Sequence, residues 1–72
     1  MEEQKPINLE TLLNKRIAVR VRDGRTLKGL LKQYDDYMNL LLEEVEEYSG
    51  DKLVARHKLM VVKGGNVQAI TT

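Results

Sequence analysis

The clearest pattern along the chain is an alternation of apolar and polar residues over positions 16–22. Ile17, Val19 and Val21 alternate there with arginine and alanine. A period of two, with β-branched residues on one side, is typical of a strand that buries a single face. The pattern therefore predicts a half-buried antiparallel strand whose opposite face carries guanidinium groups.

Turn-forming residues divide the rest of the chain into four further segments of strand character. Asp23-Gly24, Ser49-Gly50-Asp51 and the segment 63–66 supply the turns, because glycine accepts backbone angles that other residues avoid. Gly29 lies inside the first segment, where a glycine usually marks a bulge, a sharp bend or a close approach of two backbones, and we interpret it as a bend of the kind that small barrels need. Leucines at 40 and 42 share one face of the second segment. The predicted strands cover residues 26–35, 38–47, 52–62 and 67–70.

A short helical pattern precedes the strands. Asn8 can cap the first turn, and Ile7 can pack on Leu12 as a hydrophobic staple. A helix of this length is too short to be stable alone, so the stripe of leucines on it must dock on the rest of the protein. We expect a polar tail over residues 1–6 and an α-helix of about two turns over residues 8–14.

One helix followed by five short antiparallel strands is typical of a mainly β fold. Strands without a long crossover form a strongly bent sheet or a small, partly open barrel. We expect a single domain over residues 1–72, with the barrel over 16–71. A chain of 72 residues without cysteine, phenylalanine or tryptophan has a small core that needs further stabilisation. Sheet edges that nothing blocks pair with other chains. Pairing of edges between copies of the chain would meet both conditions.

The composition removes several classes of function. The chain has no cysteine and one histidine, which excludes disulfides and a thiol nucleophile and disfavours a metal cluster. It also has no nucleophile and base pattern or phosphate-binding loop, so we predict neither an enzyme nor a cofactor or metal. We interpret His57 as structural. The longest apolar run, residues 59–62, is far too short to span a membrane, and we expect a cytoplasmic protein.

Charge is arranged in blocks that the net charge of +1 conceals. Residues 1–14 carry −2, residues 15–32 carry +6, residues 33–51 carry −7 and residues 52–72 carry +4. A near-zero sum over such blocks does not argue against a polyanionic partner, because the blocks can face different surroundings. The glutamates of 43–47 do not converge on a cation, since consecutive strand positions point to opposite faces. We interpret them as a solvated edge or as salt bridges between subunits.

Two segments carry a resemblance to a known family. The first spans residues 24–31 and 34–42, in which Gly29 precedes an Asp-x-x-Met-Asn-Leu core at 35–40, and the second spans residues 61–67. They resemble the two motifs of the Sm-like (LSm) family, and the chain is most similar to its archaeal members. The resemblance implies a bent five-stranded barrel with a helix stacked on it. It also implies a ring, typically of seven copies, in which the fourth strand of one subunit pairs with the fifth of its neighbour.

The same resemblance implies that single-stranded RNA, often uridine-rich, binds near the pore, where each subunit offers one base pocket. Carried over position by position, the pocket comprises Asp35, Tyr37, Asn39, Lys63 and Gly64. The Asn39 amide both donates and accepts, so it can pair with two groups on the edge of uracil. A flipped amide would pair equally well with cytosine. We therefore hypothesise that the Asp35 carboxylate accepts one amide proton and fixes the orientation of Asn39.

Three positions depart from the family pattern. Tyr37 stands where histidine is usual and keeps an aromatic surface on which a base can stack. Lys63 stands where arginine is usual, so the charge is kept but the planar guanidinium is lost, and we expect weaker stacking on that side. Gly65 replaces a common acidic residue, so the arginine and its charge partner have changed together.

Other residues and functions have two interpretations each. A possible second RNA surface, directed at phosphates, consists of arginines on the first strand and its turn, and the alternative is a solvated face. These arginines are Arg16, Arg20, Arg22 and Arg25. The pocket residues could also form a plain polar connection between strands. Two functions follow: a ring-forming RNA chaperone or scaffold in RNA processing, and a ring-forming assembly or protein-interaction module with a weakened RNA pocket.

Overall fold

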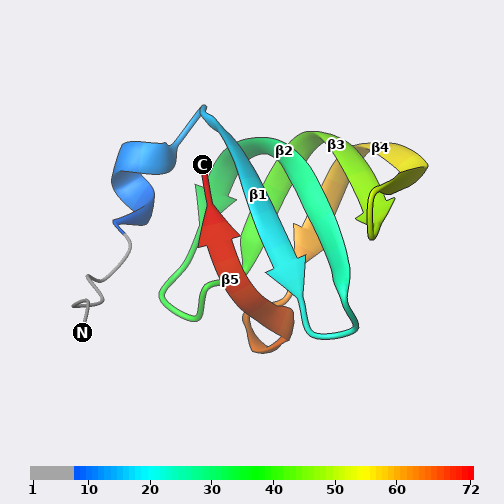
Figure 1. The fold of residues 1–72 in the computed structure, drawn as a ribbon. Coiled ribbons are helices and arrows are strands. Elements are labelled where there is room, and N and C mark those ends of the chain that lie inside the picture. Colours follow the sequence, from blue (N-terminus) through cyan, green and yellow to red (C-terminus); the bar gives the residue numbers. More distant parts are fainter. Residues whose placement is uncertain (1–7) are drawn as a thin grey trace.

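A computed structural model describes residues 8–72, which form a curved sheet and two 3₁₀ turns (Figure 1). The predicted tail over 1–6 and the predicted staple at Ile7 lie outside the described residues. The strands are β1 Arg16–Val21, β2 Arg25–Tyr34, β3 Leu40–Ser49, β4 Lys52–Val62 and β5 Val67–Thr71. The turn η1, Leu9–Leu12, precedes β1, and the turn η2, Gly64–Asn66, joins β4 to β5.

The strand order in the sheet is β4-β3-β2-β1-β5, and every neighbouring pair is antiparallel. This arrangement confirms the predicted mainly β fold with a strongly bent five-stranded sheet. In Figure 1 the red β5 lies beside the cyan β1, on the far side of the sheet from β4. Because β4 and β5 are the two ends of this order, the barrel is partly open and both strands are edges.

Apolar side chains of the strands fill the inner face of the sheet. Ile17, Val19 and Val21 are buried while Arg16 and Arg20 are exposed, so the alternation predicted for the first strand is confirmed. The predicted shared face of the leucines at 40 and 42 is likewise buried. The core comprises Leu9, Ile17, Val19, Val21, Leu27, Leu31, Leu40, Leu42, Val45, Val62 and Ile70.

Gly29 lies where β3 leaves little room for a side chain on β2. A Cβ atom on Gly29 would lie 3.0 Å from the Glu43 carbonyl oxygen and 3.1 Å from Cγ2 of Val45. The register between β2 and β3 shifts beside Gly29, and Glu44 adopts a φ of 53° in the left-handed region. Of the features that a glycine inside a strand predicts, the close backbone approach is confirmed; Glu44 and Val45 of β3 face the single Gly29, so the extra residue of the bulge lies in β3.

The N-terminal segment is shorter and tighter than the predicted α-helix over 8–14. Asn8 caps it as expected, with its side-chain oxygen accepting from the Glu10 nitrogen, but the turn ends at Leu12. The Asn14 nitrogen donates to the Leu31 carbonyl of β2 at 2.7 Å instead of to a helical partner. Docking on β2 therefore takes the donor that another helical turn would need. The leucines of the segment pack on the core, as predicted.

Candidate functional site

One carboxylate holds the loop between β2 and β3, residues 35–39. Oδ1 of Asp35 accepts from the backbone nitrogens of Tyr37 at 2.9 Å and Asn39 at 3.0 Å. Oδ2 accepts from Nδ2 of Asn39 at 2.9 Å, which is the hydrogen bond hypothesised from the sequence. These bonds, that of the Asn39 amide above all, hold the pKa of Asp35 below its ordinary value. The carboxylate thus shapes the loop and orients its asparagine at the same time.

The inner part of this loop is anchored to the core, and its outer part reaches solvent. Met38 adopts a φ of 61° and packs against the core cluster. The side chain of its neighbour Tyr37 is 81% exposed. An aromatic ring so far from any packing partner offers a free surface on which a planar group can stack.

The turn after β4 touches this loop through Gly64. The Gly64 nitrogen donates to Oδ1 of Asn39 at 2.8 Å. A Cβ atom on Gly64 would lie only 1.7 Å from the Tyr37 carbonyl oxygen, so no other residue fits without moving a backbone. Asn39 and Gly64, which are 25 residues apart in sequence, thus bring the two motifs into contact.

The Asn39 amide is fixed from both ends and is still able to bind. Its nitrogen carries two protons, of which Asp35 takes one, and its oxygen carries two lone pairs, of which the Gly64 nitrogen takes one. One donor and one acceptor are left side by side, in an order that the two bonds determine. Asn39 is only partly buried, so these groups can face a ligand.

The structure brings the five predicted pocket residues to the same place. Asp35, Asn39 and Gly64 are joined by hydrogen bonds, and Tyr37 lies between the first two in the loop. Lys63 is exposed, precedes Gly64, and its charge contributes to the lowered pKa of Asp35. The sequence reasoning missed the Gly64 nitrogen as a donor, because a backbone contact between two loops leaves no signal in residue types.

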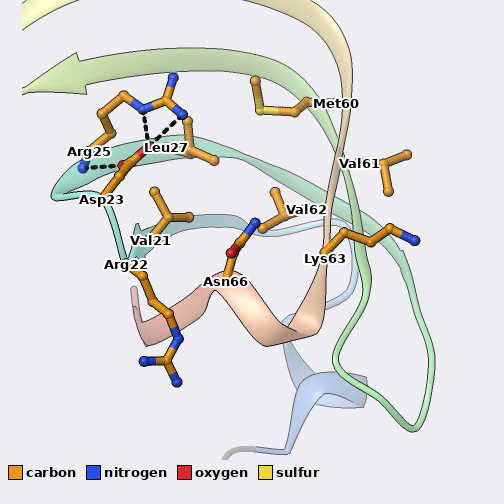
Figure 2. A pocket seen from close by; sticks show the side chains of 10 residues that line it. All are labelled: Val21, Arg22, Asp23, Arg25, Leu27, Met60, Val61, Val62, Lys63 and Asn66. Carbon is orange, nitrogen blue, oxygen red and sulfur yellow. Dashed lines mark hydrogen bonds and ion pairs between the residues drawn. The ribbon is translucent and has the colours of Figure 1, made fainter.

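A sixth residue, Arg22, contacts the turn that carries Lys63 and Gly64. Its Nε donates to the Gly65 carbonyl at 2.8 Å, and its backbone nitrogen donates to the Asn66 carbonyl at 3.0 Å. Figure 2 shows Arg22 and Lys63 at opposite ends of η2, with Asn66 directed into the pocket of about 220 Å³ between them. Arg22 thus contacts this turn, although it lies in the sequence directly after β1.

Two of the four arginines proposed as a second surface are paired with carboxylates of the described residues. Arg16 pairs with Glu46 at 3.0 Å, and Arg25 pairs with Asp23 and with a glutamate of β3. Arg22 lies beyond the opposite end of β1 from Arg16, about 20 Å away at the usual strand rise. Arg20 is exposed and pairs with no carboxylate among residues 8–72. Carboxylates of the acidic block therefore neutralise two of the four.

The expectation that the acidic run 43–47 is a solvated edge is wrong for Glu47. Glu47 is only 8% exposed, because the shift at Glu44 turns it toward the inside of the sheet. His57 and Arg25 donate to it, and these bonds hold its pKa below the ordinary value. His57 therefore has the structural contact that its interpretation requires.

The described residues also bear on membrane and metal binding. No helix within residues 8–72 has the length and apolar character needed to cross a bilayer. The same residues contain no group of three or more His, Cys, Asp or Glu side chains placed to hold a metal ion.

Comparisons with known proteins agree with the family resemblance of the two motifs. Residues 7–72 match the family model of the LSM domain. An Sm-like protein of Methanococcoides burtonii is 37% identical over 59 residues, which cover 82% of each chain. Among solved structures, the Sm protein of Pyrococcus abyssii in complex with a uridine heptamer gives a TM-score of 0.85 at 30% identity, covering 88% of this chain and 89% of that one. A heptameric archaeal Sm protein gives a TM-score of 0.81 at 35% identity, covering 88% and 91%.

Proposed function

Because the chain belongs to the LSM domain family, we propose that it forms a ring that binds single-stranded, uridine-rich RNA near its pore. In this role it acts in the cytoplasm as an RNA chaperone or scaffold and catalyses no reaction. The observation that carries the proposal is the Asn39 amide, which two hydrogen bonds hold in one orientation while a donor and an acceptor stay available.

Ring formation follows from the edges of the sheet. The edge strand β4 exposes Leu59 and Val61, at 60% and 64%, on a chain whose core is small. Unpaired edges of this kind associate with other strands, and β5 of a second copy is the available partner. A head-to-tail contact between β4 and β5 repeats until the ring closes. The heptameric archaeal Sm protein, which this chain resembles, supports seven copies.

Base selectivity follows from the order of the two free groups on Asn39. Uracil presents a carbonyl acceptor beside the N3 donor, whereas cytosine presents an amino donor beside the N3 acceptor. In one pose, the free Nδ2 proton of Asn39 meets the uracil carbonyl and Oδ1 meets the N3 proton. With the amide fixed, cytosine would bring donor against donor and acceptor against acceptor. The preference for uracil thus depends on Asp35 and Gly64 as much as on Asn39.

Affinity comes from stacking, charge and repetition. The exposed Tyr37 ring stacks on one face of the base, a contact worth about 1–3 kcal/mol per base. Lys63 adds a positive charge on the other side but no planar surface. Each pocket is weak alone, and several pockets on one ring hold the same strand at high effective concentration.

Binding of labelled oligo-U, oligo-C and oligo-A of equal length, at two salt concentrations, tests the proposal. We expect the wild type to prefer oligo-U, Asn39→Ala to lose binding, and Asp35→Ala to lose the preference of U over C. Asp36→Ala is the matched control, because it removes an exposed carboxylate from the same loop. An unchanged U-to-C ratio in Asp35→Ala would refute the assignment of selectivity to the oriented amide.

The assembly-module function is the other outcome of the same experiment. It is favoured if the protein forms rings and none of the three oligonucleotides binds. In that case the loops 35–39 and 63–66 would serve only to connect strands.

A further inference from the structure

The turn that carries Lys63 and Gly64 is held by an arginine 43 residues away in the sequence. We propose that Arg22 is a positioning residue for base selectivity: by binding the Gly65 carbonyl it keeps the Gly64 nitrogen on Oδ1 of Asn39. Arg22 is not required to touch the base itself. This inference rests on the proposed function, since it concerns how the same pocket distinguishes uracil from cytosine.

The turn has two backbone hydrogen bonds of its own, from the Asn66 nitrogen to the Lys63 carbonyl at 2.9 Å and from the Val67 nitrogen to the Gly64 carbonyl, and neither holds the Gly65 carbonyl. Two consecutive glycines give the backbone more conformations to lose than any other pair of residues. Gly65 is exposed, and a Cβ atom placed on it would meet nothing within 4 Å, so packing does not hold it. Within the described chain, its carbonyl is held by Nε of Arg22 at 2.8 Å. The resemblance places an acidic residue at 65 as the partner of an arginine at 63; here position 65 is glycine, and its backbone carbonyl binds Arg22 instead.

A continuous series of hydrogen bonds leads from Arg22 to the amide. Backbone and side chain of Arg22 bind the Asn66 and Gly65 carbonyls, so both of its bonds fix the C-terminal half of the turn. Gly64 and Gly65 lie together in η2, which the bond from the Asn66 nitrogen to the Lys63 carbonyl closes at 2.9 Å, so a displacement of the Gly65 carbonyl also shifts the Gly64 nitrogen. The Gly64 nitrogen then sets the Asn39 amide. Movement of the turn would release one of the two bonds that prevent the amide from flipping.

The partner of Arg22 distinguishes it from its neighbours on β1 and the following turn. Arg16 and Arg25 bind carboxylates, so their charges are compensated within the subunit. Arg22 instead donates from Nε to a neutral backbone carbonyl. This hydrogen bond positions the carbonyl but does not neutralise the positive charge of the guanidinium. A role in positioning and a role in binding phosphate are therefore separable by substitution.

Two neutral substitutions separate them. Arg22→Gln removes the charge but places its amide nitrogen as many bonds from Cα as Nε of arginine, so a donor to the Gly65 carbonyl is kept. Arg22→Met has a similar length, no charge and no donor. Lys52→Gln is the control for charge alone, because Lys52 is an exposed cation at the far tip of the β3–β4 hairpin. The native mass of each variant shows whether the ring is kept.

The measured quantity is the ratio of the dissociation constants for oligo-C and oligo-U of equal length. We expect Arg22→Met to lower this ratio by about threefold to tenfold per occupied pocket, the equivalent of one hydrogen bond. Arg22→Gln and Lys52→Gln should keep the wild-type ratio. The dependence of affinity on salt should be the same for Arg22→Gln and Arg22→Met, since both lose the same charge.

Two results would overturn the proposal. One is a wild-type ratio in Arg22→Met with the ring intact. The other is an equal fall in affinity for oligo-U and oligo-C, with a smaller salt dependence, in both Arg22 variants, which would assign Arg22 to phosphate binding. Failure of the proposed function looks different, because the wild type itself would then show no preference for oligo-U, or Asn39→Ala would leave that preference unchanged.

Discussion

Among the five glycines, Gly64 leaves the least room for a Cβ atom, so Gly64→Ala should displace the backbone more than alanine at any other glycine. The new Cβ would lie 1.7 Å from the Tyr37 carbonyl oxygen and 2.9 Å from its carbonyl carbon, whereas real Cβ contacts essentially never fall under 3.0 Å. The backbones must therefore separate by about 1.3 Å, which is more than a 2.8 Å hydrogen bond to Asn39 tolerates. Overpacking of this kind costs about 1–3 kcal/mol.

The matched control for Gly64→Ala is Gly65→Ala, one residue along the same turn. A Cβ atom at Gly65 meets nothing within 4 Å, so this change should be neutral or stabilise by up to about 1 kcal/mol through the unfolded state. Urea unfolding at one fixed protein concentration measures both variants, because ring assembly couples to stability. Gly64→Ala should also lose the preference for oligo-U. The reasoning fails if both variants unfold alike and select uracil alike.

Three further changes test other parts of the account. Tyr37→Ala should weaken oligo-U binding by about 1–3 kcal/mol per base in fluorescence anisotropy and leave the melting temperature unchanged, because the ring is 81% exposed; a lower melting temperature would contradict this. Gly29→Ala should destabilise by about 1–3 kcal/mol in thermal unfolding, since its Cβ meets β3 at 3.0 Å, and a neutral result would argue against the close approach. Glu47 has a lowered pKa, so its ionised form stabilises the fold above about pH 4.5 and this contribution is lost as the pH falls through the lower value in the folded protein. The melting-temperature difference between wild type and Glu47→Gln should therefore shrink as the pH falls below about 4.5, and a difference that does not change in this range would refute the contribution.

Features set by local sequence could be predicted. The alternation at Ile17, Val19 and Val21 defines a buried face whatever the strand pairs with, and the close backbone approach at Gly29 is signalled by a glycine inside a strand. The Asp35–Asn39 hydrogen bond joins residues four apart in one loop. Short-range geometry leaves few other arrangements for such a pair, so its residue types were sufficient.

Features set by distant contacts could not be predicted. The helix ends early because the Asn14 nitrogen finds the Leu31 carbonyl, an interaction that only the folded sheet creates. Glu47 is buried because a left-handed residue, Glu44, changes which face the following positions occupy. The bond from Arg22 to Gly65 spans 43 residues and ends on a backbone atom, so no residue type signals it.

Native mass spectrometry of the protein with a seven-nucleotide oligo-U measures the size of the ring and the binding of RNA in one experiment. We predict a nucleic-acid-free ring of seven 8.3 kDa chains, about 58 kDa, and a single added oligo-U per ring. Oligo-C of the same length should be retained far less, and Asn39→Ala should keep the ring while losing the oligo-U. A monomer at micromolar concentration, or a ring that retains oligo-U and oligo-C equally, would contradict it.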